Sequence, residues 1–284
     1  MILREALQSA TQTLLEAGIS DASIEAQLLL GYVLGMSKTQ VYTEPERALT
    51  QAETERLRHL VQRRLNREPI AYILQRCEFF GIDFYVDYDA FIPRPETEIL
   101  VEEAIKLAEH LAQRKEQIEI ADIGTGCGAI AISLALAIPK AKIYATDISA
   151  SALKVAQVNC RRHGVNGRVE LLQGDLLAPL PQAVDIVVAN LPYIKDCEFK
   201  DLSPEIINFE PMMALAGGKD GLDKIRQLLE QMSGKLNSGG SFLLEVGQGQ
   251  GETVKCLVSK YFPGASIKLI PDLGGIDRVV EVVL

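Results

Sequence analysis

A tetrapeptide, Asn190-Leu191-Pro192-Tyr193, directly follows a run of apolar and β-branched residues at 184–189. Such a run predicts a buried strand, and Pro192, which has no N–H to donate to a neighbouring strand, would end it. Asn190 would then project from a sheet edge, where its side chain offers one carbonyl acceptor and one amino donor. The ring of Tyr193 could cover the same flat group. These four residues, which we call the clamp, predict a site for a planar nitrogen, although a strand that simply ends in a proline turn would look the same.

A second candidate site is the glycine-rich turn Gly124-Thr125-Gly126-Cys127-Gly128. It lies between a predicted strand at 118–122 and an apolar helix at 129–137. Turns of this kind bind nucleotide cofactors, because glycines allow the backbone to approach a ligand closely. The spacing fits the dinucleotide pattern G-x-G-x-x-G/A and, together with Asp122, equally fits the acidic glycine loop of S-adenosylmethionine enzymes. The turn alone therefore leaves two cofactor classes open.

Asp147 follows the strand predicted at 142–146 and is a candidate to bind the ribose of the cofactor. A carboxylate at this place would accept hydrogen bonds from ribose hydroxyls in either cofactor class. A structural alternative is that Asp147 caps the helix that begins near Ser149. The glycine turn upstream favours the ribose role.

The positions of the histidines in the sequence favour one of the two cofactor classes over the other. A dehydrogenase needs a proton-handling group, often histidine, opposite its nicotinamide. His59, His110 and His163 all fall within predicted helices, away from strand ends. A methyltransferase that acts on nitrogen instead needs a positioned lone pair, and Asn190 could provide that positioning. The combination of motifs favours S-adenosylmethionine as the cofactor.

Several further segments extend this pattern over nearly the whole chain. In order along the sequence they are 67–74, 78–81, 91–98, 122–128, 147, 190–193, 209–211, 214–215, 217–218, 220–222 and 272–278. With these segments the chain resembles the HemK/PrmC family, the peptide-chain-release-factor glutamine N5-methyltransferases. The stretch Ile-Pro-Arg-Pro-Glu-Thr-Glu at 92–98 is the most distinctive of them. The clamp by itself indicates only amino or amide methylation.

The resemblance implies a substrate and a role for each candidate residue. The substrate would be the glutamine of the Gly-Gly-Gln motif in peptide chain release factors, which act in translation termination. The catalytic residues would be those of the clamp, Asn190, Leu191, Pro192 and Tyr193. S-adenosylmethionine would be bound by Gly124, Thr125, Gly126, Cys127, Gly128, Asp147, Asp175, Leu176 and Asn190. The substrate would be bound by the clamp together with Arg94 and Glu96.

Three residues depart from the family pattern. Leu191 stands where proline is usual, Gln75 where glycine is frequent, and Cys127 where serine or threonine is common. The second clamp position is expected to contribute a main-chain carbonyl, so leucine should preserve that contact, and Pro192 keeps Leu191 extended. The glycines around Cys127 should keep the shape of the turn, and Gln75 affects a local turn outside the site.

The chain is expected to have three parts, a helical bundle at 1–66, a connector at 67–95 and a methyltransferase domain at 96–284. Apolar residues at helical spacing, and a capping box at Thr50 and Glu53, predict the bundle. The connector would contain a β-hairpin around Gly81 and a stiff, proline-rich stretch. We expect the bundle to recognise the substrate, because it has no cofactor motif.

Strands alternate with helices from residue 96 onward, which predicts an α/β fold. The predicted strands are 118–122, 142–146, 168–173, 184–189, 241–246, 265–270 and 278–283, and the predicted helices are 96–114, 129–137, 150–163, 221–235 and 251–261. Most strands would form a parallel, Rossmann-like sheet with helices on both faces. The last two strands are joined too closely for a parallel crossover and would form an antiparallel hairpin. Such a hairpin is typical of class I S-adenosylmethionine-dependent methyltransferases, whereas a dehydrogenase sheet stays parallel.

Composition indicates the compartment. No apolar stretch approaches the roughly 20 residues of a membrane span, and residues 1–7 predict an amphipathic helix rather than a signal peptide. The five cysteines are scattered without a C-x-x-C pair, which predicts reduced thiols, no disulfide and no metal site. We therefore expect a cytoplasmic protein that does not contact a membrane, and we expect it to be a monomer.

The net charge of −9 arises entirely after residue 76. Residues 1–76 contain nine basic and nine acidic residues, so the remaining 20 basic and 29 acidic residues account for the −9. The basic cluster at 56–67 alternates with Glu53 and Glu55 and predicts a solvated helix face. An enzyme that acts on nucleic acid would be expected to show a basic face. We expect no direct contact with nucleic acid, and the charge fits a protein substrate.

Three alternatives stay open. A methyltransferase for a ribosomal-protein glutamine would share the same core. An N6-adenine nucleic-acid methyltransferase uses a related clamp on a flipped base, but it should show a basic cleft or a target-recognition domain. A non-catalytic cofactor-binding module would not need both Asp147 and an intact clamp.

Overall fold

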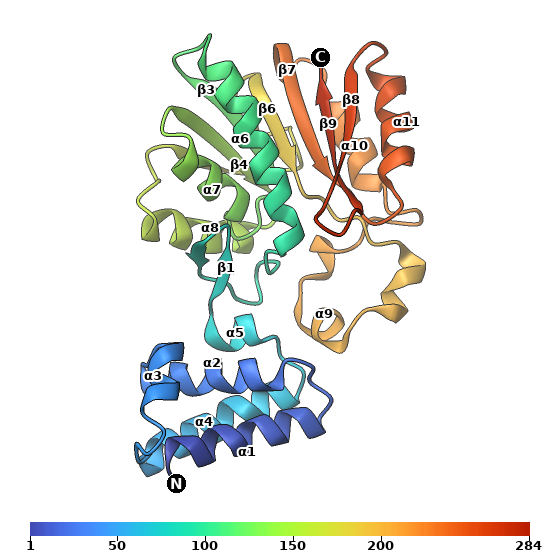
Figure 1. Cartoon of the computed structure of the whole chain (residues 1–284). Helices are drawn as coiled ribbons and strands as arrows, with labels where there is room; N and C mark the ends of the chain where they lie inside the picture. The colour runs from blue at the N-terminus through green and yellow to red at the C-terminus, as the bar shows by residue number, and fades with distance from the viewer. The chain divides into compact units, whose positions relative to one another are not determined.

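The computed structural model describes residues 1–284, which form two compact units. The helical unit comprises residues 1–75 and 203–209, and the sheet unit comprises 76–202 and 210–284 (Figure 1). The helical unit extends past the predicted limit at residue 66, because Ile73 packs into its hydrophobic core. It also includes a short segment that follows the clamp in the sequence, which periodicity did not predict.

The helical unit has a hydrophobic core of its own. Its helices are α1 (Leu3–Glu16), α2 (Ala22–Leu34), α3 (Lys38–Thr43), α4 (Gln51–Leu65), α5 (Ile70–Leu74) and α9 (Pro204–Phe209). α1 buries Leu3 and Leu14, which lie on one face of the helix. The predicted capping box begins α4, where the Thr50 hydroxyl accepts from the Glu53 N–H and the Glu53 carboxylate accepts from the Thr50 N–H.

One arginine of the predicted solvated face is buried. Arg64 is 6% exposed, with Nε 2.6 Å from Glu25 Oε2 and Nη1 3.1 Å from Glu205 Oε1. Arg67 also reaches Glu205 Oε1, at 3.3 Å. The prediction of a solvated face is therefore wrong for Arg64, because acidic residues from two other segments of the unit surround it. Removing one partner of a buried ion pair costs about 3–5 kcal/mol, so this cluster holds the 203–209 segment in the helical unit.

The sheet unit contains a seven-stranded sheet in the order β5-β4-β3-β6-β7-β9-β8. Its strands are β3 (Ile118–Ile123), β4 (Ala141–Asp147), β5 (Val169–Gln173), β6 (Val184–Ala189), β7 (Leu236–Glu245), β8 (Ser266–Pro271) and β9 (Asp277–Val283). The strands β3 to β7 pair in parallel, and β9 runs antiparallel to both β7 and β8. The predicted α/β sheet with an antiparallel final hairpin is confirmed.

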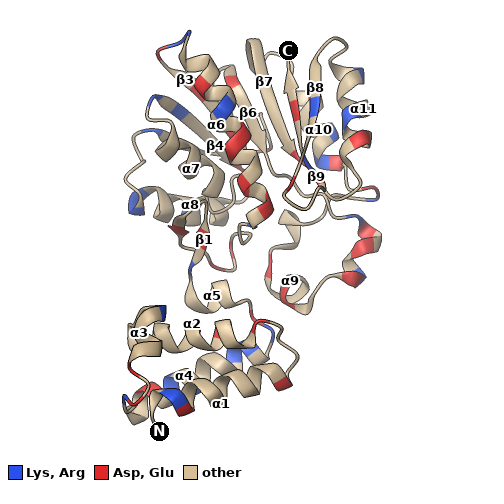
Figure 2. Ribbon diagram, viewed as in Figure 1, with Lys and Arg blue, Asp and Glu red and all other residues tan.

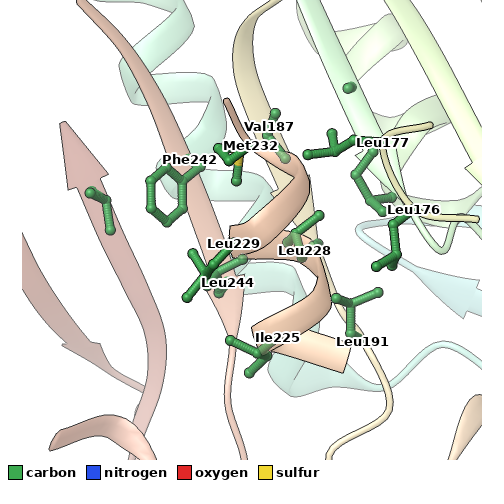
Figure 3. Packing of buried hydrophobic residues seen from close by; sticks show 14 of the residues in the cluster. Leu176, Leu177, Val187, Leu191, Ile225, Leu228, Leu229, Met232, Phe242 and Leu244 are labelled. Atoms are coloured by element: carbon green, nitrogen blue, oxygen red, sulfur yellow. The ribbon is translucent and has the colours of Figure 1, made fainter. Parts of the chain in front are cut away.

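Helices cover both faces of this sheet. They are α6 (Glu98–Ala112), α7 (Ala129–Ala137), α8 (Ala150–Arg162), α10 (Asp223–Gln231) and α11 (Gly251–Tyr261). Every residue of β6 is buried, as expected for a central strand that is covered on both sides. On one face, α10 packs into a cluster that includes Leu228, Val187 and Phe242 (Figure 3). This layer fixes the end of β6, where the clamp begins.

Short elements complete the sheet unit. The strands β1 (Cys77–Phe79) and β2 (Ile82–Phe84) form the predicted antiparallel hairpin. The 3₁₀ helices η1 (Pro95–Thr97), η2 (Asp196–Asp201) and η3 (Met212–Ala214) lie before α6 and after β6. None of the helices in the chain combines the length and the apolar character that a membrane span requires.

Candidate active site

A cavity of about 310 Å³ lies at the carboxyl ends of β3, β4, β5 and β6. Open parallel sheets bind ligands at this edge, and ligand pockets typically measure about 300–1,000 Å³. Most of the predicted site residues lie on its wall, namely Gly124, Thr125, Gly126, Cys127, Asp147, Asp175, Leu176, Asn190, Leu191, Pro192 and Tyr193. The glycine turn and the clamp therefore share one cavity.

Three predicted site residues do not line the cavity. Gly128 precedes α7 with a φ of +86°, and a Cβ there would lie 3.0 Å from Ile132 Cδ1, so glycine permits close packing. Arg94 forms an ion pair with Glu210 and places its guanidinium 4.6 Å from the centre of the Phe91 ring. Glu96 is exposed. Arg94 thus contacts a cavity residue, because Phe91 itself lines the cavity.

The glycine turn is shaped by hydrogen bonds to the end of β4. The N–H groups of Gly124 and Thr125 both donate to the Thr146 carbonyl at 2.9 Å. Gly124 has a φ of +75°, and a Cβ there would lie 3.3 Å from Leu191 Cδ2. Gly126 has a φ of +56°, and a Cβ there would meet no protein atom within 4 Å. Gly126 lines the cavity, and glycine leaves open the space that a side chain would take.

Asp122 supports the turn from inside the protein. Its side chain is fully buried, and Oδ2 accepts hydrogen bonds from the Thr125 hydroxyl at 2.6 Å and from the Ala131 N–H at 3.1 Å. Burial raises the pKa of Asp122 to about 7, although these two bonds favour the carboxylate. Asp122 therefore holds the turn in place without lining the cavity.

Asp147 joins the turn to β4 on the cavity wall. Its Oδ2 accepts from the Gly126 N–H at 2.9 Å, and its Oδ1 accepts from the Ser149 N–H at 2.8 Å. Burial raises the pKa of Asp147, and the Ser149 and Gly126 N–H groups partly counter this. Ser149 is the residue that caps α8, since its hydroxyl accepts from the Ala152 N–H at 3.2 Å. The Asp147 carboxylate keeps acceptor capacity that a ribose hydroxyl could use.

Asn190 and Leu191 begin the clamp at the end of β6. The Asn190 Nδ2 donates to the Thr97 hydroxyl oxygen at 3.0 Å, which leaves Oδ1 to accept from a ligand. Leu191 is 5% exposed and packs into the hydrophobic cluster beside α10 (Figure 3). The leucine that stands in place of the family's usual proline thus anchors the clamp to the core.

Tyr193 is enclosed by three glycines. A Cβ on Gly221 would overlap the Tyr193 carbonyl oxygen, and one on Gly217 would lie 2.8 Å from its carbonyl carbon. A Cβ on Gly247 would lie 3.0 Å from ring atom Cδ2. The Gln250 Nε2 donates to the same carbonyl oxygen at 3.0 Å. Burial raises the pKa of Tyr193 to about 12.

Sequence reasoning missed two polar residues near the clamp. Thr97 lines the cavity, and Glu245 lies at the end of β7, and each is 3% exposed. Burial raises the pKa of Glu245 to about 7. The signal that could have revealed Glu245 is a single acid at the end of an apolar strand, which is also the position of Asp147. Pro93 of the proline-rich stretch also lines the cavity, as the family resemblance implied, whereas Tyr88, Phe91, Ile148 and Met213 on the wall were not predicted.

The cavity residues suit S-adenosylmethionine. The open space beside Gly126, where a side chain would stand, suits the methionine portion. Asp147 offers acceptors for ribose hydroxyls. Ile148 and Leu176 provide an apolar wall for a flat base, with Asp175 as a polar neighbour.

Comparison with known proteins identifies the family. Residues 5–74 match the family described as PrmC N-terminal domain, and residues 103–218 match the family described as methyltransferase small domain. A release factor glutamine methyltransferase from Moorella thermoacetica is 40% identical over 279 residues, covering 98% of this chain and 97% of that protein. One from Geobacter sulfurreducens is 39% identical over 279 residues, covering 98% of this chain and 95% of that protein.

One solved structure has a fold similar to that of this chain. A methyltransferase from Pyrococcus furiosus has a TM-score of 0.51 at 20% identity, covering 72% of this chain and 89% of that one. This likeness confirms the predicted class of sheet, and the matched methyltransferase domain makes S-adenosylmethionine the methyl donor. The chain therefore belongs to the release factor glutamine methyltransferase family and is an S-adenosylmethionine-dependent enzyme.

Proposed function

We propose that this protein methylates the side-chain amide nitrogen, N5, of the glutamine in the Gly-Gly-Gln motif of peptide chain release factors. The observation that carries the proposal is that Asn190 and Tyr193 line the same cavity as Asp147 and the glycine turn. A clamp for a planar amide thus lies beside a site for the methyl donor. The names of the relatives support the choice of substrate.

The clamp would act on the amide by alignment. An amide nitrogen is a poor nucleophile, because its lone pair is delocalised into the carbonyl. The Asn190 Oδ1 and the Leu191 carbonyl would accept the two N–H groups of the substrate amide, while the Tyr193 ring covers its plane. Alignment of this kind can lower a reaction barrier by several kcal/mol, up to about ten.

The surroundings of the clamp would favour transfer without a dedicated base. When bound, S-adenosylmethionine supplies a methyl group on a positively charged sulfur, and the nitrogen–carbon bond forms as the sulfur–carbon bond breaks. The nitrogen then releases a proton to solvent, because a protonated amide is a strong acid. Phe91, Pro93 and Leu191 give the cavity wall apolar surface, which favours a step in which the positive charge on sulfur is dispersed over the methyl group and the nitrogen.

We further propose that the helical unit recognises the protein substrate. All residues that line the cavity belong to the sheet unit, so the helical unit is available for another role. In the view of Figure 2, Lys and Arg are interspersed with Asp and Glu in both units, a pattern that suits a protein better than nucleic acid. The glycines of Gly-Gly-Gln would let the substrate loop enter a narrow site. In this proposal the enzyme acts as a monomer and does not contact nucleic acid directly.

Methyl transfer from labelled S-adenosylmethionine tests the proposal. Purified release factors, ribosomal proteins and nucleic acid would be offered in parallel, and mass spectrometry would locate the label. We expect label on the glutamine of Gly-Gly-Gln and none on a release factor in which that glutamine is replaced by alanine. Label on ribosomal proteins alone would assign the other protein substrate, and label on adenine would assign a nucleic-acid methyltransferase.

A further inference from the structure

A buried glutamine joins the clamp to the segment that follows β7. Gln250 lies directly before α11 and is 6% exposed. Its Nε2 donates to the Tyr193 carbonyl oxygen at 3.0 Å, and its Oε1 accepts from the Gly247 N–H at 2.8 Å. The Gln250 main-chain N–H also donates to the Gly247 carbonyl, at 3.0 Å. One residue therefore binds the main chain of the clamp and both polar main-chain groups of Gly247.

The two side-chain bonds fix the orientation of the Gln250 amide. A side-chain amide has a carbonyl oxygen that accepts and an amino group that donates. The Gly247 N–H can only donate, so the amide oxygen must face it. The amino group must then face the Tyr193 carbonyl oxygen, which can only accept. A flipped amide would place two donors together at Gly247 and two acceptors together at Tyr193, so Gln250 acts toward the clamp as a hydrogen-bond donor.

The same segment of the chain also contacts the side chain of Tyr193. A Cβ on Gly247 would lie 3.0 Å from ring atom Cδ2, so glycine leaves the room that the ring needs. The Tyr193 hydroxyl lies 3.5 Å from Oε1 of Glu245, the last residue of β7. Residues 245–250 thus contact the hydroxyl, the ring and the carbonyl of Tyr193. Gln250 is bonded both to Tyr193 and to the glycine that packs against its ring.

The residue after Tyr193 is held in a different way. The Ile194 N–H donates to the Leu215 carbonyl at 3.0 Å, and the Ile194 carbonyl accepts from the Gly217 N–H at 2.9 Å. These are main-chain bonds, whereas the Tyr193 carbonyl accepts from a side chain. The bond from Gln250 fixes the peptide plane between Tyr193 and Ile194. Because the backbone of Tyr193 carries its side chain, a change in this plane would move the ring.

We propose that Gln250 is a positioning residue, which holds the Tyr193 ring where it covers the plane of the substrate amide. Tyr193 lines the cavity and Gln250 does not, so Gln250 acts through Tyr193 and not by contact with a ligand. The inference rests on the proposed function, because the substrate amide is what the ring would cover. A glutamine that only stabilised the fold would affect the Tm but leave the turnover of the folded enzyme unchanged.

Turnover of Gln250 variants is the first test. Gln250→Met has a side chain of similar length that cannot donate, and Gln250→Glu keeps an oxygen for the Gly247 N–H but has, as a carboxylate, no hydrogen for Tyr193. Gln248→Met and Gln248→Glu, at an exposed position of the same segment, are matched controls. With a purified release factor, we expect both Gln250 variants to lower kcat by about tenfold to hundredfold, the scale for a small misplacement of a reacting group. The controls should keep the wild-type kcat, and the affinity for S-adenosylmethionine, measured by calorimetry, should not change in any of the four. Wild-type kcat in either Gln250 variant, once folded, would overturn the proposal.

A double-mutant cycle tests whether Gln250 acts through the Tyr193 ring. Tyr193→Ala removes the ring but keeps the carbonyl to which Gln250 donates. Residues that act through one another have effects that are not additive. We therefore expect Gln250→Met to lower kcat in the wild-type background and to have no further effect on kcat in Tyr193→Ala. Equal fold-losses in the two backgrounds would overturn the proposal.

Fluorine NMR reports the position of the Tyr193 ring without turnover. The enzyme is prepared with 3-fluorotyrosine at its eight tyrosines, and the Tyr193 signal is identified by its absence in Tyr193→Phe. We expect this signal to move in Gln250→Met and to stay in place in Gln248→Met. An unmoved signal in Gln250→Met would overturn the positioning proposal. If the signal moves as expected but the wild-type enzyme methylates no release factor, the proposed function fails and the positioning of Tyr193 by Gln250 stands.

Discussion

Asn190 and Asp147 lie on the wall of one cavity, but Asn190 is proposed to act mainly on the acceptor amide and Asp147 on the cofactor, so they can be tested separately. Asn190→Ala should abolish methyl transfer and leave the affinity for S-adenosylmethionine nearly intact, because Asn190 is proposed to hold the acceptor amide. Calorimetry with S-adenosylmethionine and a turnover assay separate the two effects. Asn190→Asp keeps the size of the side chain but cannot donate to Thr97, and it should also be inactive. Near-normal turnover in Asn190→Ala would contradict the hypothesis that the clamp holds the acceptor amide.

Replacement of Asp147 should act on the cofactor. Asp147→Asn should weaken the binding of S-adenosylmethionine by about 1.5–3 kcal/mol, the scale for a hydrogen bond to a charged group. It keeps one carbonyl oxygen, so it retains one of the two backbone hydrogen bonds and loses the other, and the Tm without cofactor should fall by less than in Asp147→Ala. Asp147→Ala loses both backbone hydrogen bonds, to Gly126 and Ser149, and should also lower the Tm. Equal cofactor affinity in Asp147→Asn and wild type would contradict the ribose role.

Ionisation of the buried Glu245 carboxyl group should lower the stability of the fold as the pH rises. Its folded pKa of about 7 lies above the ordinary 4.5. Its contribution to stability is therefore fully present below about pH 4.5 and is lost as the pH rises through about 7, a difference of about 3 kcal/mol in unfolding free energy. Glu245→Gln cannot ionise, so it should be more stable than wild type at pH 8 and similar at pH 4.5. Urea unfolding at both pH values measures this, and equal stability at pH 8 would show that the buried charge is not costly.

Among the elements, those with a clear period could be predicted from the sequence. Every strand and helix expected from residue 96 onward forms, because β-branched runs and helical spacing extend over enough residues to be recognised. The short helices α3 and α5, of six and five residues, were not predicted. Helices this short depend on tertiary packing more than on their own residues. Gln75, which ends α5 with a left-handed φ of +52°, shows why the family often has glycine there.

The candidate site likewise has parts that could be predicted from the sequence and parts that could not. The glycine turn and the clamp are each continuous in the sequence, so their residue types could be recognised together. Thr97 and Asn190 are 93 residues apart, and the fold alone brings them into contact. The packing of Gly217, Gly221 and Gly247 around Tyr193 could not be predicted either, because the sequence does not show which atoms lie close to a glycine.

The packing of glycines around Tyr193 can be tested with two glycines that have the same φ. Gly221 and Gly249 both have a φ of +79°, but a Cβ on Gly249 would meet nothing within 4 Å, whereas one on Gly221 would overlap Tyr193. Gly249→Ala should therefore cost only the strain of the left-handed conformation, about 1–2 kcal/mol. Gly221→Ala should cost more and should reduce turnover by displacing the clamp. If the two variants have equal Tm and equal turnover, the enclosure does not position Tyr193.

At the scale of the whole molecule, the two units should have different tasks, cofactor binding and methyl transfer in the sheet unit and recognition of the release factor in the helical unit. A chain that begins at Arg76 retains every cavity residue. It should bind S-adenosylmethionine and methylate a free Gly-Gly-Gln peptide as the full chain does. Its kcat/KM on an intact release factor should fall by at least about tenfold, which corresponds to about 1.4 kcal/mol. Glu205→Ala in the full chain keeps both units and is the milder comparison. Unimpaired methylation of the intact factor by the shortened chain would refute the assignment of the helical unit.

The 203–209 segment has a consequence for the order in which the protein is made. Synthesis proceeds from the amino end, and early domains generally fold before later ones. Arg64 has Glu25 available from the start, but Glu205 lies 141 residues further along the chain. The helical unit must therefore wait for most of the sheet unit to be synthesised before α9 can join it. Residues 190–193 have been synthesised by that time. The helical unit, which is proposed to recognise the substrate, is therefore completed only after the clamp that would methylate the substrate has been made.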